Sequence, residues 1–518
     1  MNTVEEMKKY LRLGWILFVM TLLCEGVLKG EEKPNVLFIA VDDLNDWIGA
    51  LDGHPLAKTP HLDRLAKRGI SFSNAHCASP VCNPSRHATM TGIHPTRSGW
   101  YGSVPLKGIE KSHEKVLNGR QPMPTHFRNE GYVTMAAGKI FHKGVKDFDY
   151  PYWDETRSSN YGFRKEAFNR SKFAPYPPDG GFFQTKYPEK ISGKSLCWAA
   201  LEDSEIPVNG MPDEQIAKWA VGQLKGSFEK PFFLAVGFLR PHVPFTAPKR
   251  FFDLYPEGSV QVPEVPKDEF KDIPIYGKAM AYGTLPEGDH EEVLQAHPEY
   301  WKELTRAYLA CVSFVDEQIG KVLDALDGSD YAENTIIVLW SDHGQHLGEK
   351  KHWRKQTLWE EATRVPLFIS YPKMKRRNEV CDQPVSLLDI YPTLSALCGL
   401  PEQELDGVNL LPLLEDADAE RGRPVLTTRY YQNHSVRSQN WRYIHYRDGQ
   451  EELYDHRDDP REYHNLAGRP EHAEVLIEHR KWLPKVDAFP AGKDSFPEDS
   501  YDKKVKEFEE KGIPFWLE

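Results

Sequence analysis

The chain has 518 residues, enough for roughly two to four domains of about 150 residues each and for a large buried core. Hydrophobic residues make up 40% of it and aromatic residues 12%, a composition that excludes long disorder and a small disulfide-stapled scaffold. The formal charge of −12 argues against a general nucleic-acid or anionic-membrane surface, so an anionic substrate would need a local cluster of cations.

The first segment with a pattern is an apolar run over residues 13–24 that follows several basic residues. This run is too short to span a bilayer, and it predicts a signal peptide over residues 1–30 with cleavage within 26–30. We therefore expect an exported protein without stable membrane insertion, in the periplasm, outside the cell or, in a eukaryote, in the lysosome. A lipoprotein anchored through Cys24 is the alternative, but Leu23 stands where a small residue is needed.

Four short apolar runs further along the chain each end in polar side chains. Continuous apolar runs of this length are typical of strands buried on both faces, as in a parallel sheet covered by helices. In such sheets ligands bind at the carboxyl ends of the strands, where these polar residues are expected to lie. The runs are Val36–Val41 before Asp42 and Asp43, Val133–Ala137 before Lys139 and His142, Phe232–Phe238 before Arg240 and His242, and Ile336–Trp340 before Asp342 and His343.

Helical patterns lie between these runs, at residues 61–68, 213–225 and 299–326. In the last of them, apolar residues recur at spacings of three and four, which is typical of an amphipathic helix. Strands that alternate with helices predict an α/β sandwich in which a large, mostly parallel sheet lies between helices. We assign this domain to residues 33–415.

The sequence pattern changes after about residue 415. Residues 425–456 alternate between polar residues and strand-forming ones, and Asp448-Gly449 predicts a hairpin turn. A last helix is predicted near residues 470–483. These patterns together predict a smaller C-terminal α+β subdomain with an antiparallel sheet, over residues 420–518.

The string CNPSR at residues 82–86 combines features that favour a bound anion. Pro84 suits the first turn of a helix, which would place Cys82 at the positive helix end beside free backbone donors. Arg86 adds a planar guanidinium that suits an oxyanion. Taken by itself, a buried structural cysteine would be the more common interpretation of Cys82.

This string, with Thr91-Gly92 after it, resembles the signature of the type I sulfatases, Cys-x-Pro-Ser-Arg followed by Thr-Gly. The resemblance runs from Lys33 to about Leu466 and points to the iduronate-2-sulfatase-like branch. It implies an alkaline-phosphatase-like fold, with residues 33–415 as the catalytic domain, and hydrolysis of sulfate esters. It also implies that a maturation enzyme oxidises Cys82 to Cα-formylglycine, whose hydrate is the nucleophile.

The resemblance further implies a calcium site. Asp42 and Asp43 match the paired carboxylates of the family, Asp342 and His343 match the other half of the site, and residue 82 completes the set. Carboxylate oxygens favour Ca²⁺, whereas the softer imidazole leaves the identity of the divalent cation open. Adjacent acids such as the first pair also occur as helix caps or loop residues.

Four further residues match the cationic groups around the aldehyde in this family: Lys139, His142, His242 and Lys355. With Arg86 and the metal, they would neutralise a sulfate ester in a preorganised site. The family mechanism implies that Asp342 accepts a proton as the hydrate attacks sulfur, while His242 or Lys355 protonates the leaving oxygen. His142 then deprotonates the second hydroxyl, which expels sulfate.

Substrate recognition is expected in the surrounding loops. An exported sulfatase points to sulfated glycans, and the branch resemblance points to 2-O-sulfated uronic acids of glycosaminoglycans. His346 and His352 are expected at the substrate rim or in a structural role. The side chains that could contact the sugar lie around Asn45, Asp46, Trp47, Trp100, Tyr101, Arg354 and Trp441, although core packing explains the aromatic ones equally well.

Two other functions are compatible with the sequence. A phosphonate or phosphate ester hydrolase of the same superfamily would handle a tetrahedral substrate of nearly the same shape, and a shared fold does not fix function. A non-catalytic sulfoglycan-binding protein would be expected to have lost at least one of the site residues, and none is lost. The sequence also permits one disulfide, between Cys381 and Cys398.

Overall fold

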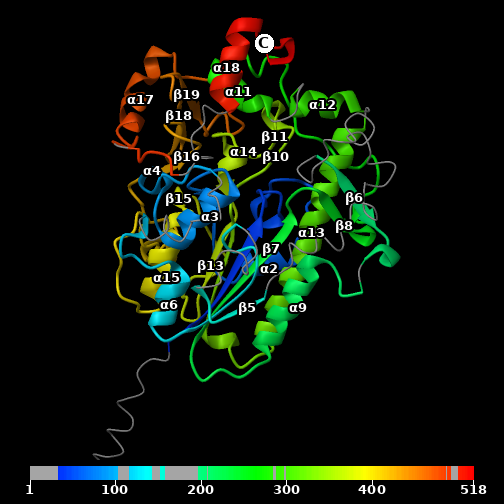
Figure 1. Cartoon of the computed structure of the whole chain (residues 1–518), viewed down its shortest axis with the longest axis vertical. Coiled ribbons are helices and arrows are strands. Elements are labelled where there is room, and N and C mark those ends of the chain that lie inside the picture. The colour runs from blue at the N-terminus through cyan, green and yellow to red at the C-terminus, as the bar shows by residue number, and fades with distance from the viewer. Residues whose placement is uncertain are drawn as a thin grey trace, which may run out of the picture. The chain divides into compact units, whose positions relative to one another are not determined.

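The centre of the structure is an eight-stranded sheet in the order β14-β2-β13-β9-β1-β7-β4-β5 (Figure 1). β13 runs antiparallel to both of its neighbours, and the other strands are parallel to one another. Each of the four predicted apolar runs forms a strand of this sheet. The bounds are β1 Asn35–Asp42, β2 Ile70–Phe72, β4 Val133–Gly138, β5 Glu155–Arg157, β7 Phe232–Pro241, β9 Thr335–Ser341, β13 Leu367–Ser370 and β14 Glu379–Cys381.

The structure is a computed structural model. It describes residues 33–102, 116–142, 152–157, 196–206, 208–283, 288–296, 299–485, 487–491 and 500–517. The expected signal peptide lies outside these residues. Among the described segments, no helix is both long and apolar enough to cross a membrane.

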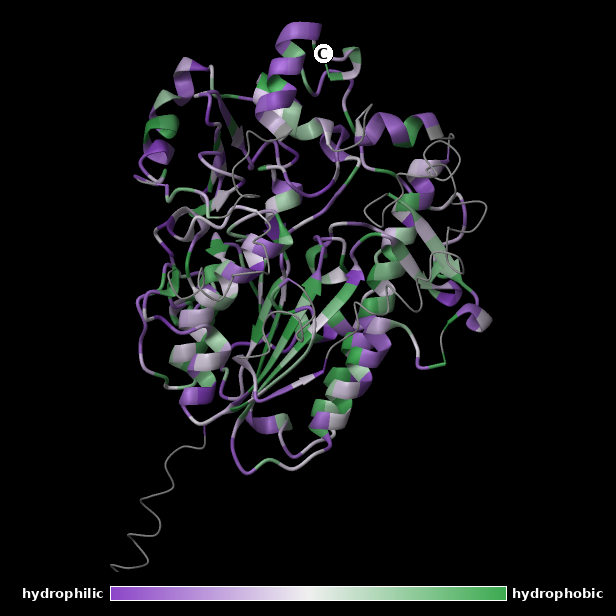
Figure 2. Cartoon of the chain, viewed as in Figure 1, coloured by the Kyte–Doolittle hydropathy of each residue, from purple (hydrophilic) through white to green (hydrophobic). Residues whose placement is uncertain are grey.

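Both faces of the sheet are buried under helices. Successive side chains of β1 point to opposite faces, so that Ile39 packs in one hydrophobic cluster and Phe38 in the other. Figure 2 shows the resulting hydrophobic strands at the centre and polar residues on the outside of the helices. The first cluster includes α2 Pro60–Ala66, α9 Pro212–Leu224 and α13 Tyr300–Asp327, and the second includes α3 Cys82–Thr91, α6 Met123–Asn129 and α15 Ile390–Leu397. The predicted α/β sandwich is confirmed.

Smaller elements surround this core. A three-stranded sheet and two two-stranded sheets lie beside the main one, and short helices connect them. The strands are β3 Ala75–His76, β6 Trp198–Leu201, β8 Phe245–Pro248, β10 His346–Leu347, β11 Trp353–Arg354, β12 Arg364–Val365 and β15 Val385–Ser386. The helices are α4 Pro95–Ser98, α10 Lys249–Phe252, α11 Ile275–Tyr282, α12 Asp289–Ala296, α14 Glu360–Thr363 and α16 Leu411–Glu415.

The C-terminal part contains the predicted antiparallel sheet, in the order β16-β17-β18-β19. Gly449 has a φ of 87° at the turn between the last two strands, which confirms the hairpin at Asp448-Gly449. The bounds are β16 Val425–Thr428, β17 His434–Arg437, β18 Trp441–His445, β19 Glu451–Asp455 and α17 Ala473–Arg480. Residues Asn35–Glu518 form one compact unit, and the boundary between 415 and 420 stays a prediction.

The prediction that the helix near 470–483 is the last one is wrong. Helix α18, Ser500–Lys511, and a 3-10 turn at Phe515–Leu517 follow it. The sequence of α18 is mostly charged and contains few apolar residues, so it shows no clear helical pattern. The helix packs on α11, which lies more than two hundred residues earlier in the chain. The rings of Phe508 and Tyr282 meet there at 5.7 Å between centroids.

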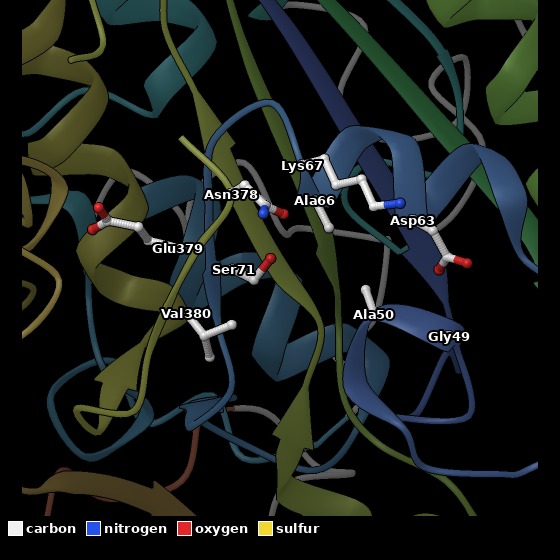
Figure 3. A pocket seen from close by; sticks show the side chains of 9 residues that line it. All are labelled: Gly49, Ala50, Asp63, Ala66, Lys67, Ser71, Asn378, Glu379 and Val380. Carbon is white, nitrogen blue, oxygen red and sulfur yellow. The ribbon is translucent and has the colours of Figure 1, made fainter. Parts of the chain in front are cut away.

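The described cysteines form no disulfide, and Cys381 and Cys398 are both buried thiols. A surface pocket of about 250 Å³ opens between α2 and the β14 edge of the main sheet. Figure 3 shows that Lys67, Glu379 and Val380 line it. It contains none of the predicted site residues, so the candidate chemistry lies elsewhere.

A buried ion network connects the C-terminal sheet to α14. The guanidinium of Arg442 is fully buried; its Nε donates to Glu462 at 2.5 Å and its Nη2 donates to Glu360. His456 Nε2 lies 2.9 Å from the same Glu462 carboxylate. Burial raises the pKa of Glu360, but Arg437, His456 and Arg442 outweigh it and hold this pKa well below the usual range.

We predict that Arg442→Met lowers the free energy of unfolding by about 3–5 kcal/mol, because the two buried carboxylates lose a shared cation. Urea denaturation measures the change. Arg457→Met is the matched control, since it removes an exposed arginine that pairs with Asp455 on the same sheet and should leave the midpoint near that of the wild type. Equal midpoints for the two variants would contradict the prediction.

Candidate active site

The acids expected to bind metal meet where two parallel strands end. β1 and β9 are neighbours, and Val41 is in register with Ser341, so the residues that follow each strand lie side by side. The backbone N–H of Asp43 donates to Asp342 Oδ1 at 3.1 Å. Asp43 has a φ of 63°, an uncommon conformation that turns the chain at the end of β1. The structure therefore places these acids side by side.

Cys82 is the first residue of α3, and Pro84 lies in the first turn, as predicted. The thiol Sγ lies 3.2 Å from His343 Nε2 and 3.0 Å from Lys355 Nζ. Ser85 Oγ donates to the carbonyl of Asp342 at 2.5 Å and so fixes the helix end against the strand end.

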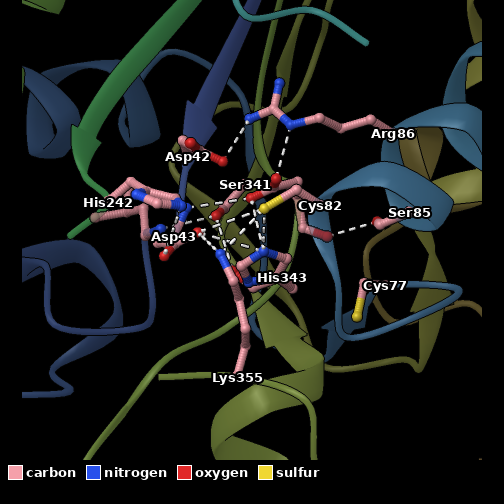
Figure 4. Close-up of polar contacts among 12 residues, drawn as sticks. Asp42, Asp43, Cys77, Cys82, Ser85, Arg86, His242, Ser341, His343 and Lys355 are labelled. Atoms are coloured by element: carbon pink, nitrogen blue, oxygen red, sulfur yellow. Dashed lines mark hydrogen bonds and ion pairs between the residues drawn. The ribbon is translucent and has the colours of Figure 1, made fainter. Parts of the chain in front are cut away.

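Five side chains converge tightly enough to hold one ion (Figure 4). One ligand atom from each lies within 4.8 Å of all the others, and all five residues are buried. The set is Asp42, Asp43, Cys82, Asp342 and His343.

Three cations balance the three carboxylates of this cluster. Arg86 Nε donates to Asp342 at 2.7 Å, Lys139 Nζ donates to Asp42 at 2.5 and 2.6 Å, and Lys355 Nζ donates to Asp43 at 2.6 Å. Burial of unpaired charges would cost several kcal/mol for each ion, so this pairing is what allows the acids to be buried.

Arg86 faces the acids. Its Nη2 donates to Asp42 at 3.3 Å, and its Nη1 donates to the carbonyls of Lys139 at 2.5 Å and Ile140 at 3.2 Å. With Nε on Asp342, each guanidinium nitrogen already has an acceptor within the protein. The geometry therefore makes Arg86 a residue that orients the carboxylates, which differs from the direct sulfate contact expected from its guanidinium.

Glycine brings Lys139 to the cluster. A Cβ atom at Gly237 would lie 2.1 Å from the Lys139 carbonyl, and one at Gly138 would lie 1.9 Å from the Gly237 carbonyl. Only glycine allows strands β4 and β7 to approach this closely. The close approach carries the lysine side chain toward the end of β1.

The charges of the cluster shift its pKa values. Burial raises the pKa of Asp43, but His242, Lys355 and His343 outweigh it and bring this pKa to about 2. Burial lowers the pKa of Lys355, but Asp43 outweighs it, so the net shift is upward. Burial raises the pKa of the Cys82 thiol to about 12, although Lys139 and Lys355 oppose the shift.

The two remaining predicted histidines border the cluster. His242 Nε2 lies 4.0 Å from Asp43 Oδ2, and its side chain is 22% exposed, so it faces the cluster from the solvent side. Burial lowers the pKa of His242 to about 4. Burial and the neighbouring Lys139 lower the pKa of His142 to about 2. The structure therefore brings all the predicted site residues into one region.

Several expected substrate-contacting residues are core residues instead. Trp47, Trp100 and Tyr101 are buried, because their rings fill the interior below these loops. His346 and His352 are also buried, and the carbonyls that face their ring nitrogens give them a structural role.

The other expected positions have intramolecular partners of their own. Arg354 pairs with Asp289, Asp46 pairs with Arg364, Asn45 bonds to Gln345, and the Trp441 ring packs on His472.

Sequence reasoning missed three supporting hydroxyl groups. Ser85 fixes Asp342, and Ser341 Oγ donates to the His343 carbonyl at 3.0 Å. Tyr308 OH donates to the Asp43 carbonyl at 2.9 Å from helix α13. Tyr308 is buried in the hydrophobic core, and only the direction of its hydroxyl shows this second role.

The sulfatase family profile matches residues 34–400, and the chain belongs to the sulfatases, which are sulfuric ester hydrolases. The profile of the N-sulphoglucosamine sulphohydrolase C-terminal region matches residues 348–488. The resemblance to the type I sulfatases is thereby confirmed.

Two relatives and one solved structure give the extent of the similarity. A sulfatase of Formosa agariphila is 39% identical over 469 residues, 89% of this chain and 88% of the relative. Iduronate 2-sulfatase of Mus musculus is 31% identical over 419 residues, 71% and 69% of the two chains. The phosphonate monoester hydrolase of Silicibacter pomeroyi has a TM-score of 0.68 and 20% identity, with 87% of this chain and 94% of that one covered, so the likeness is one of fold.

The sulfatase family implies a divalent metal at the cluster, and the residues fit one. Asp43 Oδ2 is buried and receives no hydrogen bond from the residues that the structure describes. An unsatisfied carboxylate oxygen among two further acids and an imidazole is a donor set that suits a divalent cation.

We predict that Ca²⁺ raises the melting temperature of protein stripped with a chelator. A free Ca²⁺ concentration one hundred times the Kd should add about 2.7 kcal/mol of stability. Asp43→Asn should lose most of this gain. Asp316→Asn is the control, since Asp316 is a buried acid that accepts backbone bonds from His61 and Leu62 far from the cluster, and it should keep the Ca²⁺ increment. Equal increments in both variants would contradict the assignment.

Proposed function

We propose that the protein hydrolyses sulfate esters of sulfated glycans through a formylglycine formed from Cys82. The observation that carries this proposal is the position of Cys82, which lies at the start of α3 with Sγ 3.0 Å from Lys355 Nζ. A maturation enzyme supplies the oxidation. The hydrate of the resulting aldehyde at position 82 is then the nucleophile.

Charge supports a sulfate ester as the substrate. The three carboxylates and three cations of the cluster cancel, so a divalent cation held by Asp42, Asp43, Asp342 and His343 would give the site an excess of two positive charges. This excess would attract and stabilise a monoanionic sulfate ester. A divalent cation held there would also polarise an ester oxygen.

The geometry suggests separate tasks for the side chains. Lys355 and His242 are partly exposed, with side chains 10% and 22% exposed, and both lie beside Asp43, so they are suited to meet the leaving oxygen. Both oxygens of Asp342 already accept hydrogen bonds, from Arg86 and from the Asp43 backbone, whereas His343 Nε2 lies 3.2 Å from Cys82 Sγ. Because His343 Nδ1 faces the Gly344 carbonyl at 2.8 Å, Nε2 is the nitrogen that would bind the cation, so His343 serves as a metal ligand and not as the proton acceptor for the nucleophile.

Substrate and location are further parts of the proposal. The similarity to iduronate 2-sulfatase of Mus musculus supports 2-O-sulfated uronic acids as the substrate class. The apolar run at residues 13–24 supports export through a signal peptide over residues 1–30. A sulfated polysaccharide, or its fragments, outside the cytoplasm would then be the substrate.

We expect mass spectrometry of the peptide that spans Cys82 to show an aldehyde in place of the thiol, when the chain is produced with a maturation enzyme. Cys82→Ala should abolish sulfate ester hydrolysis because the nucleophile is removed. Cys77→Ala is the matched control, since Cys77 is a buried thiol five residues earlier that lies outside the metal cluster, and it should retain activity. Full activity in protein that carries only the thiol at position 82 would disprove the nucleophile.

Parallel assays of aryl sulfate, aryl phosphate and phosphonate monoester distinguish the main proposal from a phosphonate or phosphate ester hydrolase. Sulfate esters should have the highest kcat/KM, because a monoanion matches the charge of the site. Lys355→Ala should lower kcat about a hundredfold through the loss of oxyanion stabilisation. Among glycan fragments, 2-O-sulfated ones should react faster than 6-O-sulfated ones.

Faster turnover of a phosphorus ester than of every sulfate ester would favour the phosphonate or phosphate ester hydrolase. Binding of sulfated fragments without turnover of any ester, in protein that carries the aldehyde, would favour a non-catalytic sulfoglycan-binding protein.

A further inference from the structure

Lys355 lies in a loop with an unusual backbone. Lys350, Lys351, Arg354 and Gln356 have positive φ angles of 55°, 45°, 74° and 89°. A residue with a Cβ atom is disfavoured in this conformation, and four within seven residues persist only where surrounding contacts fix the chain. The position of the Lys355 ammonium therefore depends on whatever anchors this loop.

The main anchor acts on Gln356, the residue after Lys355. Its carbonyl accepts hydrogen bonds from Tyr501 OH at 3.0 Å and from Arg429 Nε at 3.3 Å. Its side-chain Oε1 accepts a further bond from Arg429 Nη2 at 2.7 Å. Its backbone N–H donates to the carbonyl of Pro80 at 3.1 Å, two residues before Cys82. Gln356 is thus fixed both to the C-terminal part and to the segment that leads into α3.

Arg429 is itself held firmly. It follows β16 and is 2% exposed, and its Cζ lies 3.4 Å from the ring centroid of Tyr430 and 5.6 Å from that of Tyr501. Cation–π contacts of this kind fix the plane of the guanidinium. A planar donor in a fixed orientation holds both oxygens of Gln356 at once, whereas a flexible lysine would reproduce this only in part.

We propose that Arg429 and Tyr501 are positioning residues that hold Lys355 over residue 82. By fixing Gln356 from two sides, they keep Lys355 Nζ 3.0 Å from Cys82 Sγ and 2.6 Å from Asp43 Oδ1. The inference rests on the proposed role of Lys355 in sulfate ester hydrolysis. It makes the C-terminal part a component of the active site.

Two neighbouring contacts agree with this role. The ammonium of Lys351 donates to the carbonyl of Trp516, and that of Lys350 donates to the carbonyl of Glu462. Both acceptors come from the C-terminal part, so three residues of one short loop are anchored there.

The first test is Tyr501→Phe, which removes one hydroxyl and keeps the ring. We expect kcat for an aryl sulfate to fall about fivefold, the effect of one lost hydrogen bond, with KM little changed. Tyr276→Phe is the matched control, because its hydroxyl donates to Asp502 Oδ1 at 3.0 Å in the same interface between α11 and α18. An equal fall in kcat for the two variants would mean a general loosening of α18 and would overturn the proposal.

A double-mutant cycle shows whether Tyr501 acts through Lys355. In the Lys355→Ala background, Tyr501→Phe should change kcat by less than about twofold, because the group that it positions is gone. Full additivity of the two effects would overturn the proposal. Arg429→Met should lower kcat about a hundredfold by displacing the loop, and Arg429→Lys should recover part of this loss in protein of unchanged melting temperature.

The outcomes separate this inference from the proposed function. If Lys355→Ala leaves kcat unchanged, or if the wild type turns over no sulfate ester, the proposed function fails and the inference fails with it. If Lys355→Ala lowers kcat about a hundredfold while Tyr501→Phe matches the wild type, the proposed function stands and the positioning role alone is overturned.

Discussion

Burial of three carboxylates at one point is the constraint on which the rest of the structure depends. They meet because β1 and β9 are parallel neighbours, and their charge can be buried only if cations accompany it. Arg86 comes from α3, Lys139 follows β4, and Lys355 comes from a loop far along the chain. A helix, a strand and a loop must therefore all dock before the acids are paired, so the same contacts that form the site also hold the fold together.

Much of the fold could be predicted because the strands are buried on both faces. A strand such as Ile336–Trp340 is apolar throughout, and the polar residues at its carboxyl end must then lie at the edge of a parallel sheet. That rule predicts from the sequence alone that the acids and Lys139 lie at the same edge of the sheet. The roles of these residues came from the resemblance, since spacing alone does not distinguish a metal ligand from a helix cap.

The parts that could not be predicted depend on contacts between distant segments. The direction in which Arg86 points is set by Asp342, more than two hundred residues away. Trp47 and Trp100 belong to loops in the sequence, but their rings lie inside the core. Helix α18 has few apolar residues of its own, and it becomes recognisable only against α11. Tyr501 of this helix bonds to Gln356, and no pattern in the sequence around residue 501 predicts a contact with that distant loop.

Cys82 is synthesised long before the residues that enclose it. Ser85, which fixes the end of α3, bonds to a carbonyl 257 residues later, and Lys355 follows later still. At ribosomal rates of about 5–20 residues per second, Cys82 exists for roughly 10–50 s before these partners are made. In the finished protein it is 4% exposed. During synthesis the Cys82 thiol is therefore accessible first, and the strand and loop that cover it in the finished protein are added afterwards.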